Sequence, residues 1–197
     1  KGEPGFGVKD GEWHPITKAV PFGASQDEWE WKADTSSDEI DGHFYSFGLY
    51  HDLVAGKEER AKVRATCRRI MDHIIEHGYY LVDLDGKPTT WGVWAPESLN
   101  DNLRWWEEKG LNSLEVLAYL KVTHHLTGDD KYEKAYRELV THHHYALNTI
   151  DQKITVEGEV NHSDDELAFL SYDSLLRYET DPHLREIYLR SLERSWQ

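Results

Sequence analysis

The first polar junction of the chain places acids and an imidazole close together. Its candidate catalytic side chains, all within six residues, are Asp38, Glu39, Asp41 and His43. If a helix begins near Ser37, Asp38 and Asp41 are i, i+3 neighbours, and Glu39 and His43 are i, i+4 neighbours. Crowded carboxyl groups take different pKa values, so one can stay protonated as a general acid while another acts as base or nucleophile. Cleavage of a glycosidic bond requires such a pair.

A structural interpretation competes for the same side chains. Asp38 and Glu39 could only cap the helix, because acids at an N-terminus accept amide protons and complement the helix dipole. His43, which is followed by Phe44, fits a hydrogen-bonded core histidine as well as a catalyst. Both interpretations stay open for this junction.

A third junction, at 161–167, offers a similar set. We assign Asp164 and Asp165 as candidate catalytic acids and His162 as a candidate substrate-binding residue. Capping competes here too, because serine or asparagine followed by an acid is an N-cap signature. Hard carboxylate oxygens suit calcium. The acids of a candidate calcium site are Asp38, Asp41, Asp164 and Asp165.

The second junction, at 111–115, and the connection before it contain candidate sugar-binding residues. Asn112 and Glu115 could bind sugar hydroxyls, although an asparagine there also reads as a cap. Trp91 and Trp94 could stack on the flat C–H face of a sugar, or could close the loop over the helix ends, since aromatic rings dominate core burial. The mechanism needs no cofactor. Hard carboxylate oxygens favour calcium over a transition metal at the histidine runs 124–125 and 142–144.

Two kinds of helical segment alternate along the chain. Apolar residues surround the first kind, which predicts burial on most sides. These inner segments are 43–54, 113–126 and 165–178. The second kind is apolar on one face at i, i+3, i+4 and i+7. These outer segments are 58–77, 131–147 and 183–196.

The connections alternate as well. Each inner segment is joined to the next outer one by a short turn with Gly or Pro. The outer-to-inner connections, 78–112 and 148–162, are long; the first reads as a β-hairpin around Asp85-Gly86, and the second could hold a smaller one around Glu157-Gly158. Antiparallel hairpins put their short turns at one end, so the three polar junctions should share a rim at the other.

Three hairpins with this alternation resemble the six-hairpin (α/α) toroid superfamily, which includes unsaturated glucuronyl hydrolases, polysaccharide lyases and sugar epimerases. The resemblance covers 34–197 and implies an all-α, (α/α) toroid-type domain with small β-hairpin insertions in the rim loops. Residues 1–33 read as an irregular N-terminal arm or the tail of an upstream domain. Three hairpins are half of such a ring, so we expect a fragment that further domains or a homo-oligomer complete.

Composition excludes several classes of partner. With 22 basic and 37 acidic residues the net charge is −15, which argues against nucleic acid and anionic membranes. The chain contains no apolar stretch long enough to predict a membrane-spanning helix. Cys67 is the only cysteine, so an intrachain disulfide and a zinc ribbon are excluded. This cysteine usage fits an extracellular or periplasmic protein and equally a cytoplasmic one.

The resemblance and the rim chemistry together predict a glycoside hydrolase-like domain acting on an oligo- or polysaccharide. Two alternatives remain. A non-catalytic glycan-binding or assembly module would use the same acids as caps and calcium ligands. A lyase or epimerase would need a base next to a uronate carboxylate, for which His43 and His162 are candidates.

Overall fold

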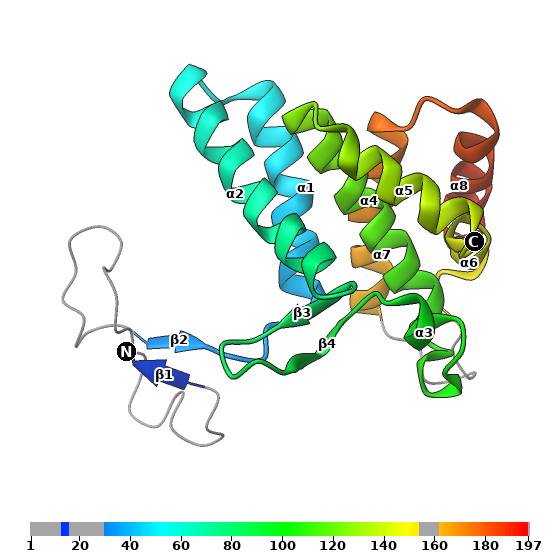
Figure 1. Ribbon diagram of the computed structural model, residues 1–197. Coiled ribbons are helices and arrows are strands. Elements are labelled where there is room, and N and C mark those ends of the chain that lie inside the picture. The colour runs from blue at the N-terminus through cyan, green and yellow to red at the C-terminus, as the bar shows by residue number, and fades with distance from the viewer. Residues whose placement is uncertain (1–12, 16–29, 154–161, 197) are drawn as a thin grey trace.

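The computed structural model describes residues 13–15, 30–153 and 162–196, which are mostly helical (Figure 1). In chain order the elements are β1 (Trp13–Pro15), β2 (Glu30–Lys32), α1 (Ser37–Leu53), α2 (Lys57–Glu76), β3 (Tyr80–Val82), β4 (Pro88–Val93), α3 (Pro96–Leu99), η3 (Leu103–Trp105), α4 (Lys109–Thr127), α5 (Asp130–Thr141), α6 (Tyr145–Asn148), η4 (Thr149–Asp151), α7 (His162–Tyr178) and α8 (Pro182–Ser195). The predicted helical hairpins are confirmed as α1–α2, α4–α5 and α7–α8.

Local sequence signals determine where these helices begin and end. The backbone amide of Ser36 donates to the Glu39 carboxylate at 2.8 Å, as in a capping box at the start of α1. Gly128 ends α4 with a φ of 66°, a left-handed conformation that glycine adopts at low cost. Asp181 caps α8, and Pro182 follows at its first position. The Gly56 amide donates to Glu59 at 2.8 Å at the start of α2, so each of the three short turns has a local cause.

The second inner helix, α4, is the centre of the molecule. Every residue from Gly110 to Thr123 is buried, and α4 packs against α1, α2, α5 and α7. The ring of Phe44 stacks on that of Tyr119 with centroids 4.4 Å apart. Burial nearly all round, predicted for all three inner segments, is correct for α4 only. Leu53, near the end of α1, is 72 % exposed because no described element covers that side.

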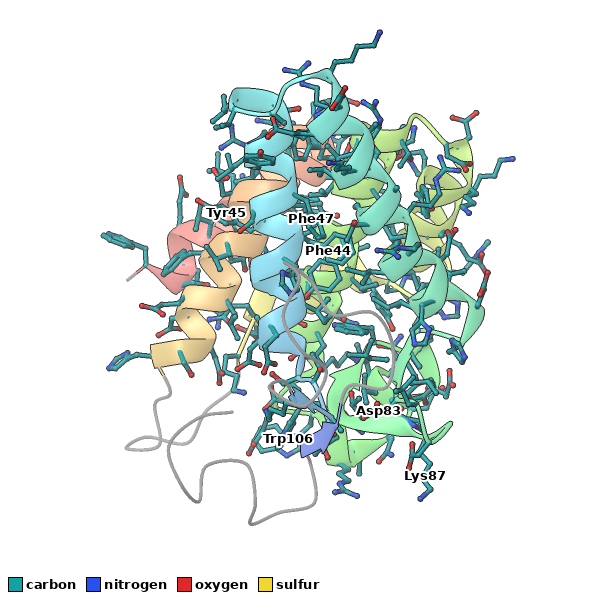
Figure 2. The ribbon with its side chains drawn as sticks, turned by 90° about the vertical axis from the view of Figure 1, so that its left-hand side faces the viewer. Phe44, Tyr45, Phe47, Asp83, Lys87 and Trp106 are labelled. Atoms are coloured by element: carbon teal, nitrogen blue, oxygen red, sulfur yellow. The ribbon has the colours of Figure 1, made fainter. Side chains whose placement is uncertain are left out.

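The first and third inner helices, α1 and α7, contact each other directly and lie side by side on the face shown in Figure 2. The Ser171 hydroxyl of α7 donates to the Asp41 carboxylate of α1 at 2.5 Å. Gly48 allows α1 and α7 to approach each other closely, since a Cβ atom at Gly48 would lie 2.7 Å from the Tyr178 hydroxyl. The three inner helices thus contact one another in a triangle, and the described residues do not confirm a toroid arrangement.

The rim connection 78–112 holds the predicted β-hairpin. Strands β3 and β4 pair antiparallel with Tyr80 opposite Val93. The hairpin is tied to the segment before α1, because the Thr90 amide donates to Asp34 at 2.6 Å and the Asp34 amide donates to Asp83 at 2.9 Å. Asp83 and Lys87 mark its position in Figure 2. This places the hairpin at the N-terminal end of α1.

The second predicted β-hairpin and the second predicted outer helix have different outcomes. The second hairpin, around 157–158, lies outside the described residues. The outer helix predicted at 131–147 is interrupted: α5 ends at Thr141, and a short α6 follows His144, whose φ is 59°. A left-handed residue cannot continue an α-helix, so the histidine run 142–144 is a connection between helices.

Candidate functional site

The N-terminal ends of α1, α4 and α7 open onto one pocket of about 370 Å³, which we call the rim pocket. Its lining includes Asp38 from the first junction, Asn112 from the second, Asp164 from the third and Trp91 from β4. The predicted meeting of the three junctions at one rim is confirmed. The cause is the hairpin geometry, which puts every short turn at the opposite end (Figure 1).

At the first junction the two adjacent acids have different surroundings. Glu39 accepts from both the backbone amide and the hydroxyl of Ser36. Burial acts to raise the pKa of Glu39, but these hydrogen bonds outweigh it and the pKa is lowered. Glu39 is therefore a helix cap, whereas Asp38 is exposed and lines the rim pocket.

Two buried carboxyl groups lie one helical turn below the pocket lining. Asp41 follows Asp38 by three residues on α1, and Glu115 follows Asn112 by three on α4. Asp41 accepts from Ser171, and Glu115 accepts from the indole nitrogen of Trp94 at 2.8 Å. The second oxygen of each carboxyl group is buried without a hydrogen bond. Neutral acids fit such sites better than charged ones.

Burial raises the pKa of both groups. The pKa of Asp41 rises to about 7 because its burial outweighs the hydrogen bond from Ser171, and the charge of Asp38 raises it further. Burial also raises the pKa of Glu115 well above its ordinary range, and the charge of Asp41 adds to this effect. Beneath the pocket, Asp41 is therefore about half-protonated at pH 7, and burial also favours the neutral form of Glu115.

Lys153 is a site residue that the sequence analysis missed. Its ammonium lies 2.6 Å from a Glu108 oxygen and 2.8 Å from an Asp164 oxygen. Burial acts to lower the pKa of Lys153, but the hydrogen bonds to Asp164 and Glu108 outweigh it and raise the pKa. The only sequence signal for Lys153 and Glu108 was their place in the two long connections.

The two candidate tryptophans have opposite environments. Trp91 is 53 % exposed at the pocket, and its ring meets that of Trp105 edge-on with centroids 6.3 Å apart. Trp94 is fully buried, and its ring lies edge-on to Tyr119. Alternation along the strand explains part of this difference. Trp94 presents no face to a ligand, so only Trp91 is placed to stack on one.

The second junction does not cap its helix. Because α4 begins at Lys109, Asn112 lies inside the first turn, and the cap interpretation of Asn112 is wrong. Its side-chain amide donates to the Val93 carbonyl at 2.8 Å and so joins α4 to β4. Glu115 is fully buried and bonded to Trp94, away from any position where it would touch a bound sugar directly.

Three other candidates do not line the rim pocket. His43 is exposed on α1 and stacks on Phe47 with centroids 5.9 Å apart, so it is not a core histidine. Asp165 accepts from the Gln152 side chain at 3.1 Å. His162 has a side chain 89 % exposed and lies 3.5 Å from Asp165. The third junction therefore contributes Asp164 to the pocket.

The candidate calcium ligands are not preassembled. Asp41 is bonded to Ser171 and Asp165 to Gln152, while the Lys153 ammonium already faces Asp164. Among the described residues, no three of the four acids bring ligand atoms within 4.8 Å of one another. Calcium at this set would require rearrangement of these contacts.

We expect Asp41→Asn to change how stability depends on pH. The folded-state pKa of Asp41, about 7, lies above the unfolded value of 3.8. As the pH rises between these values, the unfolded chain releases its proton first, so Asp41 makes the wild type progressively less stable until the folded pKa is passed. The free energy of unfolding of Asp41→Asn should therefore rise relative to that of the wild type between pH 5.5 and 7, by up to about 1.4 kcal/mol per pH unit.

Urea unfolding at pH 5.5, 6.2 and 7 measures this difference. Asp85→Asn is the control: Asp85 is exposed in the β3–β4 turn, and the backbone hydrogen bond from Lys87 lowers its pKa, so it should not alter the slope in this range. A constant difference between Asp41→Asn and wild type across the three pH values would contradict the raised pKa.

Comparison with known proteins gives no relative: no family model, curated protein or solved structure matches this chain. Among the described helices, none combines the length and the apolar character needed to cross a membrane. The geometry of the rim pocket is therefore the basis on which a function can be inferred.

Proposed function

We propose that the protein binds a sugar unit of an oligo- or polysaccharide in the rim pocket and hydrolyses a glycosidic bond by carboxylate general acid/base catalysis. The observation that carries the proposal is the meeting of Asp38 and Asp164, from different helix N-termini, with the exposed indole of Trp91 in one pocket. Carboxylates accept hydrogen bonds from sugar hydroxyls, and an indole face packs against sugar C–H groups. The same carboxyl groups supply the acid and base.

The contacts distribute the roles within the pocket. Asp38, which is exposed, is the proposed proton-transferring carboxyl group. The Lys153 ammonium lies 2.8 Å from an Asp164 oxygen, and this ion pair suits a carboxylate that acts as base or nucleophile. Asp41, one turn below Asp38, keeps a proton close to the pocket floor. Glu39 has no part in the chemistry, because Ser36 occupies its Oε2 atom and the Lys32 ammonium lies 3.7 Å from its Oε1 atom.

The wider predictions support the same class of function. The hairpins have the inner–outer alternation of six-hairpin toroid enzymes, and a ring would need further hairpins from the same polypeptide or a second copy. A glycan substrate fits an extracellular or periplasmic location. A calcium ion is a further prediction, for which Asp38 and Asp164 are the remaining ligands at the pocket.

A second candidate is a glycan-binding module without catalysis. Lys153 favours it, because its ammonium pairs with both Glu108 and Asp164, so that Asp38 is the pocket acid without an ion pair among the described residues. The Asp38 carboxylate accepts from the Ser37 hydroxyl at 3.4 Å. Such a module would bind the same sugars through Trp91 and leave them intact. A lyase or epimerase is less well supported, since His43 does not line the pocket.

Asp38→Asn tests the hydrolase proposal. Neutral and uronic-acid-containing oligosaccharides are incubated with the wild type, and release of reducing ends is measured. We expect cleavage of at least one substrate, and a loss of at least about 100-fold in kcat for Asp38→Asn because a proton-transferring group is removed. Asp173→Asn, at an exposed Asp173–Arg177 pair on α7, is the control and should cleave as the wild type does. Full activity in Asp38→Asn would remove Asp38 from the mechanism.

Binding separates the two candidates. Calorimetry with the same oligosaccharides should show about tenfold weaker binding for Trp91→Ala, because the stacking face is lost. Trp106→Ala is the matched control, since Trp106 is 44 % exposed and does not line the rim pocket. Binding that depends on Trp91, without any cleavage, would identify the binding module. No binding to any glycan of the panel would refute both.

A further inference from the structure

The C-terminal ends of α1 and α4, opposite the rim pocket, carry a cluster of three side chains. We call it the His–Asp–His cluster, and its members are His51, Asp52 and His125. His51 and Asp52 lie in the last turn of α1, and His125 lies in the last turn of α4. These ends are far along the helices from the β3–β4 hairpin and the rim pocket (Figure 1). Helix C-termini carry partial negative charge, so two of them favour a cation here.

The donor atoms of the cluster are already close together. His51 Nδ1 lies 2.8 Å from Asp52 Oδ1, and His125 Nε2 lies 3.0 Å from Asp52 Oδ2. One ligand atom from each residue can be chosen so that all three lie within 4.8 Å of one another. Bonds of about 2.0–2.1 Å to zinc place neighbouring donors roughly 3.0–3.4 Å apart. An ion could thus replace the hydrogen-bonding protons between Asp52 and the two histidines with only small movements of these side chains.

Other side chains orient the cluster. The Tyr178 hydroxyl donates to Asp52 at 3.1 Å, and its ring stacks on His125 with centroids 4.2 Å apart. Partners of this kind hold metal ligands in position. Arg64 acts in the opposite direction, because its guanidinium lies 3.1 Å from His51 Nε2 and is a competing cation.

We propose that His51, Asp52 and His125 bind a divalent transition-metal ion of the zinc class, which ties the end of α1 to the end of α4. Two imidazoles and one carboxylate form a ligand set that suits zinc, nickel and cobalt rather than calcium. The Asp52 and His125 side chains are 30 % and 39 % exposed, so an ion can enter from solvent and keep water as a further ligand. This site is independent of the rim pocket.

Zinc titration of the untagged, metal-free protein by calorimetry tests the proposal, with Co²⁺ absorbance as a second readout. We expect binding at the cluster in wild type and at least tenfold weaker binding at that site in His125→Ala. His77→Ala is the matched control: His73 and His77 form another helical histidine pair, with ring centroids 4.2 Å apart. It should leave cluster binding unchanged.

Two results would overturn the site: wild type that binds no zinc, or His125→Ala that binds it as tightly as wild type. Thermal unfolding in EDTA checks that both variants fold. Arg64→Gln gives an independent test, because removing the competing charge should tighten zinc binding several-fold. Weaker zinc binding in Arg64→Gln would contradict the inference that the Arg64 guanidinium competes with the metal ion at His51.

Discussion

Gly110→Ala should destabilise the protein by about 3 kcal/mol or more, as severe overpacking does. Gly110 lies in the first turn of α4, where an added Cβ would overlap the Asp151 carbonyl oxygen and lie 2.7 Å from the Gln152 Cα atom. These are backbone atoms, so no side-chain rotation relieves the clash. Movement of this segment would also displace Lys153 from the rim pocket. Urea unfolding measures the loss.

Gly42→Ala is the control for this prediction. Gly42 also lies inside a helix, α1, but a Cβ there meets no atom within 4 Å. Alanine is better than glycine in a helix interior by up to about 1 kcal/mol, so this variant should be as stable as wild type or slightly more stable. Equal effects of the two substitutions would refute the close approach of α4 to the 151–152 segment.

Lys121→Met should cost about 3–5 kcal/mol, because it leaves the buried Glu179 carboxylate without its cation. The Lys121 ammonium on α4 lies 3.0 Å from Glu133 of α5 and 3.6 Å from Glu179, which follows α7. The Glu179 side chain is fully buried, and its other oxygen accepts the amides of Thr180 and Asp181. Water cannot replace the lost charge at Glu179.

Lys131→Met is the matched comparison. Lys131 pairs with Asp72 at 2.7 Å, but its side chain is 47 % exposed, so the loss should stay within about 1 kcal/mol. The double variant Lys121→Met/Glu179→Gln should recover part of the stability, since it removes the buried charge together with its partner. If Lys121→Met were no more destabilising than Lys131→Met, the buried ion pair would not be what holds these helices together.

The helices could be predicted from the sequence because their signals are local. Caps such as Asp181 with Pro182, and a C-terminal glycine such as Gly128, act within one turn of the chain. The apolar character of the second inner segment correctly indicated complete burial. The same inference was wrong for the first, because exposure of Leu53 depends on which helices lie alongside, and periodicity does not encode neighbours.

The candidate site could be predicted in part. Loop lengths determine which helix ends share a rim, so Asp38, Asn112 and Asp164 were expected together and do meet in one pocket. Lys153 and Glu108 carry no motif, and their pairing joins residues far apart in the chain. Such a contact follows only from the path of the connections in space.

The sequence by itself determined the three helical hairpins, the β3–β4 hairpin and the end at which the polar junctions gather, because caps, turns and periodicity act over a few residues. Only the tertiary structure decided which junction acids cap a helix and which line the rim pocket, and which tryptophan is exposed to solvent. Glu39 is held by Ser36, Glu115 lies beneath the pocket with Trp94, and Asp38 remains open. Burial and charge pairing depend on the packing of distant segments. They decide which candidates are accessible, and burial is the cause of the raised pKa values of Asp41 and Glu115.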